Sequence, residues 1–100
     1  MLTQKNILST LKKLKPMYES EGVLLLGLFG SYAQNKQTSF SDIDIVYHLN
    51  YDKFSQKYKD GFSKLLRLYE IKKDLENRFK TKVDFISDKN ENILDKAIYV

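Results

Sequence analysis

Two aspartates separated by one residue are the first feature of this sequence that could do chemistry. Asp42 and Asp44 begin a stretch in which apolar and polar residues alternate, a pattern that predicts a β-strand. Alternate residues of a strand point to the same face, so both carboxylates would leave that face together. Like charges so placed repel unless a cation lies between them, and Mg²⁺ prefers carboxylate and phosphate oxygens. The alternative is a strand whose polar face is simply wet by solvent.

A glycine and a serine precede these aspartates and directly follow the apolar run 23–29. Gly30 would let the backbone approach a phosphate closely, and Ser31 would add a hydroxyl group and the amide of a short helix opening there. The sequence therefore predicts a phosphate-binding turn close to a pair of metal ligands.

A third acid, Asp84, lies in the short apolar and aromatic stretch 82–86, which we expect to be a strand. An acid flanked by Val83 and Phe85 is unexpected there unless it is paired, solvated or bound to a metal. On a strand adjacent to Asp42 and Asp44, its carboxylate would complete a two-metal site.

The elements that must position these residues follow from apolar spacing. Thr3 can cap a helix over residues 4–14, and Pro16 would lie just beyond its end. Residues 23–29 are apolar on both faces, which is typical of a buried central strand, with a helix as the alternative. Residues 42–49 form the second strand, with Ile43, Ile45, Tyr47 and Leu49 on one face and Asp42, Asp44, Val46 and His48 on the other.

The second half of the chain predicts helices around the third strand. Apolar residues recur at three- and four-residue steps over 55–79, so we expect one long amphipathic helix, with Gly61 as an alternative start. Asp88 or Asn90 could cap a last helix that ends near Ile98. The fold class is therefore α/β or α+β, a single domain over residues 1–100 with a small mixed sheet. We expect three or more strands, helices on one side, and the metal site at an open edge or face.

Composition narrows the function classes. The chain has 100 residues, 42% hydrophobic and 30% charged, and no cysteine, which excludes disulfides and thiolate chemistry. The longest apolar run is too short to span a membrane, so we expect a soluble cytoplasmic protein. The formal charge is +4. It fits either a solvated lysine-rich surface or attraction to a polyanion such as nucleotide phosphate, RNA or an acidic partner.

The combined motifs resemble a known family. Gly30-Ser31, ten intervening residues and Asp42-Ile43-Asp44 resemble the G-S-x10-D-x-D signature of the DNA polymerase beta-like nucleotidyltransferase superfamily. Residues 28–33, 41–45 and 83–86 are most similar to its minimal nucleotidyltransferase (MNT) family. The resemblance extends over nearly the whole chain, and Gly-Ser with a correctly spaced D-x-D is a specific signal.

The resemblance implies roles for the site residues. Gly30 and Ser31 would hold the triphosphate of ATP, and Asp42 and Asp44 would bind Mg²⁺, with two ions expected. Asp84 would be a further metal ligand and the base that activates the attacking hydroxyl group. Many relatives have Arg and Gly after the Gly-Ser-x-Ala segment, whereas this chain has Gln34-Asn35-Lys36. Lys36 could replace the missing cation as a point charge, but not as a bidentate guanidinium.

The resemblance also implies a partner. Members of this family are typically antitoxins paired with a HEPN-domain ribonuclease toxin, and they attach AMP to a tyrosine of that toxin. A hetero-oligomer with a HEPN toxin is therefore expected, with no requirement for nucleic acid or a membrane. Two alternatives stay open: an antitoxin that masks the toxin by binding alone, and an enzyme that transfers a nucleotide to a small molecule or an RNA end.

Overall fold

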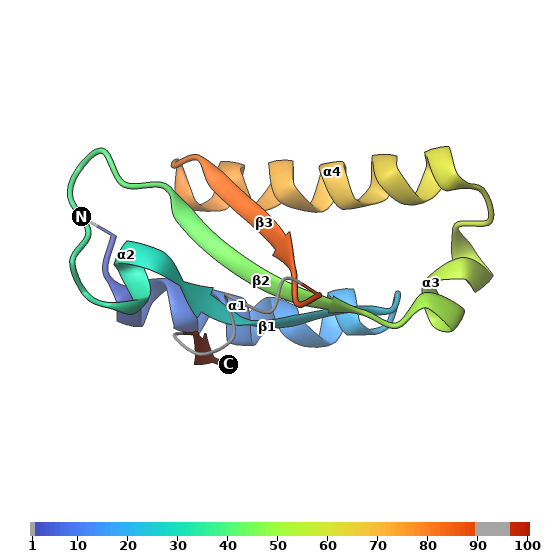
Figure 1. The fold of residues 1–100 in the computed structure, drawn as a ribbon, viewed down its shortest axis with the longest axis horizontal. Coiled ribbons are helices and arrows are strands. Elements are labelled where there is room, and N and C mark those ends of the chain that lie inside the picture. Colours follow the sequence, from blue (N-terminus) through green and yellow to red (C-terminus); the bar gives the residue numbers. More distant parts are fainter. Residues whose placement is uncertain (1, 90–96) are drawn as a thin grey trace.

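The computed structural model describes residues 2–89 and 97–100 and contains one mixed sheet covered by helices (Figure 1). The elements are α1 (Gln4–Glu19), β1 (Val23–Phe29), α2 (Gly30–Ala33), β2 (Ile43–Leu49), α3 (Tyr51–Lys57), α4 (Gly61–Phe79), β3 (Val83–Ser87) and β4 (Ile98–Tyr99). The sheet order is β3-β2-β1-β4. β1 is antiparallel to β2 and β4, whereas β2 and β3 are parallel. The predicted mixed α/β fold is confirmed.

The core lies between one face of the sheet and the two long helices, α1 and α4. Both helices contribute to a single apolar cluster, and Tyr18 of α1 hydrogen-bonds Asp74 of α4. The strands present Leu25, Leu28 and Ile45 to this cluster. Figure 1 shows α1 and α4 running along the strands, with α2 and α3 at opposite ends of the long axis. The predicted arrangement, with helices on one side, is therefore confirmed for α1 and α4.

A β-bulge explains why β1 is apolar on both faces. Leu25 pairs with Tyr47 and Gly27 pairs with Val46, so Leu26 is the extra residue in β1. The bulge shifts the alternation by one residue, and both Leu25 and Leu28 are consequently buried in the core. After the bulge, Phe29 pairs with Asp44 and fixes where the next turn begins.

Two of the predicted helices have different bounds in the structure. The first helix does not stop at residue 14 but continues through Pro16 to Glu19. The predicted helix over 55–79 is two helices, α3 and α4, and α4 begins at Gly61, the alternative start, with Asp60 as its N-cap. The expected last helix falls mainly on residues 90–96, outside the described residues. After this segment the chain enters the sheet, where Ile98 pairs with Leu28.

The connection from α4 to β3 is short and fixed at both ends. Lys80 ends the helix in the left-handed conformation, with φ of 56°. The carboxylate of Glu76 accepts a hydrogen bond of 3.0 Å from the backbone N–H of Val83, the first residue of β3. Asp84 is the next residue, so α4 determines the position of this acid.

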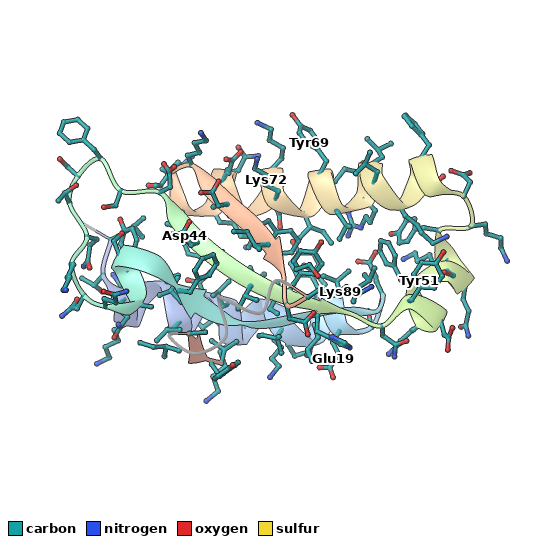
Figure 2. All side chains as sticks on the ribbon, in the orientation of Figure 1. Glu19, Asp44, Tyr51, Tyr69, Lys72 and Lys89 are labelled. Carbon is teal, nitrogen blue, oxygen red and sulfur yellow. The ribbon has the colours of Figure 1, made fainter. Side chains whose placement is uncertain are left out.

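Several large apolar side chains remain exposed on the described surface. They include Tyr51 of α3 and Tyr69 of α4, which Figure 2 labels, together with Phe40, Phe62, Leu65 and Leu66. No helix in the described ranges is long and apolar enough to cross a membrane.

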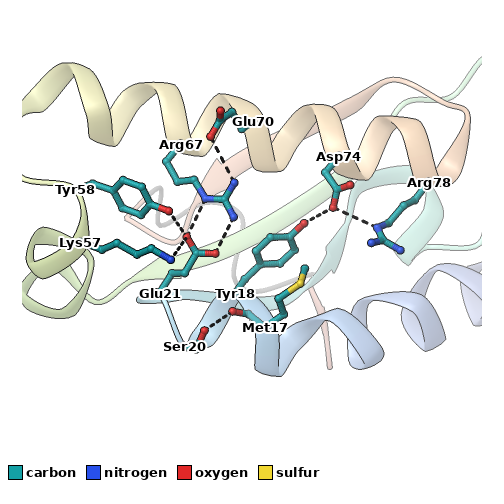
Figure 3. A network of polar contacts seen from close by, with 10 residues as sticks. All are labelled: Met17, Tyr18, Ser20, Glu21, Lys57, Tyr58, Arg67, Glu70, Asp74 and Arg78. Carbon is teal, nitrogen blue, oxygen red and sulfur yellow. Dashed lines mark hydrogen bonds and ion pairs between the residues drawn. The ribbon is translucent and has the colours of Figure 1, made fainter.

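A buried ion pair ties α4 to the turn after α1 (Figure 3). The carboxylate of Glu21 is 8% exposed and accepts hydrogen bonds from Arg67 Nε at 2.9 Å and Arg67 Nη2 at 2.7 Å. Tyr58 donates a third hydrogen bond to the same carboxylate. These bonds, those from Arg67 above all, hold the pKa of Glu21 below its usual value. The bidentate geometry therefore fixes α4 against the rest of the fold.

Candidate active site

The parallel pairing of β2 and β3 brings two acids together that are far apart in the sequence. Asp44 lies opposite Asp84 in the register, so both side chains leave the same face of the sheet. The carboxyl group of Asp84 is close enough to act electrostatically on that of Asp44. Figure 2 labels Asp44 near one end of the sheet. The prediction that Asp84 lies on a strand next to the D-x-D pair is thus confirmed, whereas its chemical role stays a prediction.

The electrostatics of the pair are unfavourable without a cation. Burial above all, then the adjacent carboxyl group of Asp84 and the charge of Asp42, raise the pKa of Asp44 to about 6. The ionised form of Asp44 is therefore destabilised both by burial and by the two neighbouring acids. A cation between the oxygens would relieve this repulsion.

Asp42 lies just before β2 and is half-buried. Its charge reaches Asp44, which places it in the same neighbourhood. Within residues 2–89 and 97–100, no three Asp, Glu or His side chains already converge as a complete set of metal ligands. The donor chemistry nevertheless fits Mg²⁺, which proteins bind through one or two carboxylates together with substrate phosphate oxygens and water.

Gly30 packs directly against the Asp44 carboxylate. Its φ is +74°, a conformation that side chains rarely adopt, and a Cβ atom there would lie 2.1 Å from Asp44 Oδ2. Glycine is therefore required both by the backbone conformation and by the close approach. The predicted neighbourhood of the Gly-Ser turn and the acids is confirmed in space.

Replacing Gly30 by Ala should destabilise the fold by roughly 1 to 3 kcal/mol, because the backbone is strained and Asp44 must move. Urea unfolding measures the loss of stability. Mg²⁺ titration followed by calorimetry measures the affinity for the cation, which should fall if Asp44 is displaced. Gly61→Ala is the matched control, since nothing lies within 4 Å of a Cβ atom at that helical position. Equal stability of the two variants would contradict the packing argument.

The turn after β1 continues into the short helix α2. Ser31 is half-buried in its first turn, as predicted. The side chain of Gln4 donates hydrogen bonds to the carbonyl groups of Tyr32 at 3.0 Å and Ala33 at 2.8 Å. The sequence did not predict this role of Gln4, because a glutamine at the start of α1 gives no local sign of a contact with Tyr32 and Ala33, so far along the chain.

Lys36 is held close to this turn by its backbone and not by its side chain. The N–H of Lys36 donates to the carbonyl oxygen of Ser31 at 2.8 Å, after Asn35 adopts a left-handed φ of 58°. The Lys36 side chain is exposed. Its predicted contact with the nucleotide stays a prediction.

A mixed sheet with paired acids beside a Gly-Ser turn defines the nucleotidyltransferase class. The family model described as polymerase beta, nucleotidyltransferase, matches residues 12–99. The chain therefore belongs to the polymerase beta nucleotidyltransferase family.

Three similar proteins come from Methanocaldococcus jannaschii. "Putative protein adenylyltransferase MJ1379" is 39% identical, over 96% of this chain and 93% of that protein. "Putative protein adenylyltransferase MJ0435" is 32% identical, over 95% of this chain and 98% of that protein. "Putative protein adenylyltransferase MJ0126" is 37% identical, over 76% of this chain. The match covers only 64% of the length of that protein.

Solved structures share the fold. A structure described as "putative minimal nucleotidyltransferase" aligns with a TM-score of 0.71 at 18% identity, over 99% of this chain and 97% of that one. A toxin-antitoxin crystal structure with AMP-PNP aligns with a TM-score of 0.52 at 25% identity. This second alignment covers 89% of the present chain and 60% of the other.

Proposed function

We propose that this chain is a Mg²⁺-dependent protein adenylyltransferase that acts as an antitoxin. It transfers AMP from ATP to a tyrosine of a cognate HEPN ribonuclease toxin, as a single domain in the cytoplasm. The observation that carries the proposal is the Asp44–Asp84 pair packed against the Gly30 turn. Similar proteins named as protein adenylyltransferases support the reaction, and the toxin-antitoxin structure with AMP-PNP supports the partner and the nucleotide.

Each site residue has a proposed role. Gly30 and Ser31 bind the triphosphate through backbone and hydroxyl groups, and Lys36 adds a positive charge at the same turn. Asp42, Asp44 and Asp84 hold two Mg²⁺ ions. When bound, these ions neutralise the triphosphate and stabilise the entering and leaving oxygens.

The proposed reaction is an in-line displacement at phosphorus. The tyrosine oxygen of the acceptor forms a bond to the α-phosphorus of ATP as the bond from that phosphorus to the diphosphate oxygen breaks. The phenolic proton passes to the Asp84 carboxylate, and diphosphate leaves. Positioning and charge neutralisation supply most of the rate enhancement in such transfers.

The decisive experiment uses ATP labelled at the α-phosphate, with Mg²⁺, in the presence and absence of the product of the neighbouring gene. We expect label on a tyrosine of that protein with the wild type and none with Asp42→Asn. A toxin that is bound and silenced without any label would instead establish a masking antitoxin. Label on RNA or a small molecule, with no protein acceptor present, would establish the third alternative.

A further inference from the structure

The outward face of α4 carries an apolar stripe that the core does not use. Phe62, Leu65, Leu66 and Tyr69 recur at helical spacing and are 74%, 69%, 45% and 53% exposed. The inward face of the same helix buries Ile71, Leu75 and Phe79. Exposed apolar residues grouped in this way often mark an interaction surface, whereas single scattered ones are ordinary.

The stripe continues into a groove between α4 and the sheet. The groove has a volume of about 230 Å³ and is lined by Tyr47, Leu65, Leu68, Tyr69, Lys72 and Phe85. The stacked rings of Tyr47 and Phe85, with centroids 4.3 Å apart, line it from the sheet side. Figure 2 labels Tyr69 and Lys72 along α4 above the strands. The groove offers a place for one large apolar side chain beside the stripe.

Charge distinguishes among the partners that could cover this face. Residues 61–82 contain seven Lys and Arg against three Asp and Glu, so the whole formal excess of +4 lies in this segment. The three acids are already engaged by cations of α4, in the pairs Glu70–Arg67, Asp74–Arg78 and Glu76–Lys73. In the described part of the chain, no carboxylate lies within 4.0 Å of the remaining lysines of this segment, Lys64, Lys72, Lys80 and Lys82. Lys64 and Lys72 interact with Asp60 and Glu76 only at longer range.

This arrangement disfavours a second copy and favours an acidic partner. Two copies would bring equal positive segments together, whereas carboxylates beside an apolar stripe would complement both the lysines and the groove. A stripe with spacing of three and four residues fits a partner helix laid along α4.

We propose that α4 is the docking surface for an acidic amphipathic helix of the protein acceptor, which inserts one large apolar side chain into the groove. The identity of this partner as the acceptor rests on the proposed function. Because Glu76 of α4 binds the N–H of Val83 next to Asp84, a partner held on α4 is fixed relative to the carboxylate pair.

The test measures the affinity of the intact chain for the product of the neighbouring gene. Leu66→Gln should weaken binding on the order of tenfold or more, as expected for an apolar interface contact. Met17→Gln is the matched control, since Met17 of α1 is 47% exposed and Leu66 is 45% exposed. Lys72→Glu should also weaken binding, whereas Lys12→Glu on α1 should not. Equal affinities for Leu66→Gln and Met17→Gln would overturn the proposal.

Kinetics separate docking from chemistry. Leu66→Gln should raise the KM for the protein acceptor and leave the KM for ATP unchanged, whereas Asp42→Asn should lower kcat. Transfer that disappears in Asp42→Asn but is unaffected by Leu66→Gln would refute the docking surface and leave the proposed function intact.

If the product of the neighbouring gene neither binds nor becomes labelled, designed helical peptides test the docking surface on α4 instead. A peptide with a leucine stripe flanked by Glu should bind the wild type more tightly than the same stripe flanked by Lys, and Leu66→Gln should abolish the difference. Equal binding of the two peptides would overturn the docking proposal. A wild-type dimer that dissociates in Leu66→Gln would overturn it as well, in favour of a second copy on this face.

Discussion

Replacing Asp44 by Asn is expected to stabilise the protein at neutral pH while it strongly reduces nucleotidyl transfer. The pKa of Asp44 is raised to about 6 in the folded state, against its ordinary value of 3.8. Between these values the folded state binds more protons than the unfolded state, so stability falls as pH rises through this window. Above it, the charged carboxyl group destabilises the fold by roughly 1 to 3 kcal/mol, which Asn would recover. Loss of the carboxylate should reduce transfer on the order of a hundredfold to a thousandfold.

Urea unfolding at about pH 7.5 and about pH 4 tests the stability half of this prediction, because the gain should vanish once Asp44 is protonated. Asp52→Asn is the control: this exposed acid lies in the first turn of α3, where its charge favours the helix. It should give no gain at either pH. A gain for Asp44→Asn that is equal at both values would refute the electrostatic origin.

Replacing Arg67 by Met is expected to destabilise the fold by about 2 to 4 kcal/mol, because it leaves the buried Glu21 carboxylate without its bidentate partner. Tyr58 and Lys57, the latter 3.9 Å away, would remain as weaker partners. The pKa of Glu21 is lowered in the folded state, so the stabilisation is fully present above the ordinary pKa of 4.5. It is lost as pH falls through the folded-state value. The difference from wild type should therefore shrink in acid.

Arg78→Met provides the comparison for this ion pair. Arg78 lies on the same helix and contacts Asp74 at 3.2 Å, but both side chains are more than 40% exposed. An exposed pair of this kind contributes only about 0.5 kcal/mol. Thermal or urea unfolding of both variants would test the contrast, and similar losses would show that burial of Glu21 is not what makes Arg67 important.

Local patterns predicted the parts of the fold that depend on one strand or one turn. The alternation after Asp42 predicted β2, and the short apolar and aromatic stretch 82–86 predicted β3, because both signals lie within a few residues. The D-x-D spacing predicted Asp42 and Asp44 on one strand face, whereas in the structure β2 begins at Ile43, directly after Asp42. The direct opposition of Asp44 and Asp84 depends on register between strands 40 residues apart, which no local pattern determines.

The errors arose where tertiary contacts overrode local rules. α1 continues past Pro16 because Leu14 and Tyr18 extend its buried face. Pro16 and Lys12 lie on the exposed face, where water can hydrogen-bond the carbonyl group that proline leaves unpaired. β4 has only two residues, too few for a periodic signal. Its trace in the sequence was Gly27, where a Cβ atom would lie 2.1 Å from the Ile98 carbonyl oxygen.

The short link between α3 and α4 divides the molecule into two pieces, each with half of the carboxylate pair. Residues 58–60 connect the helices, and Lys59 and Asp60 are exposed. A chain cut between them would leave Asp44 in the first fragment and Asp84 in the second, and neither fragment alone would hold the paired acids. Each fragment fused to one of two interacting proteins would make a split reporter, in which nucleotidyl transfer returns only when β2 and β3 pair again.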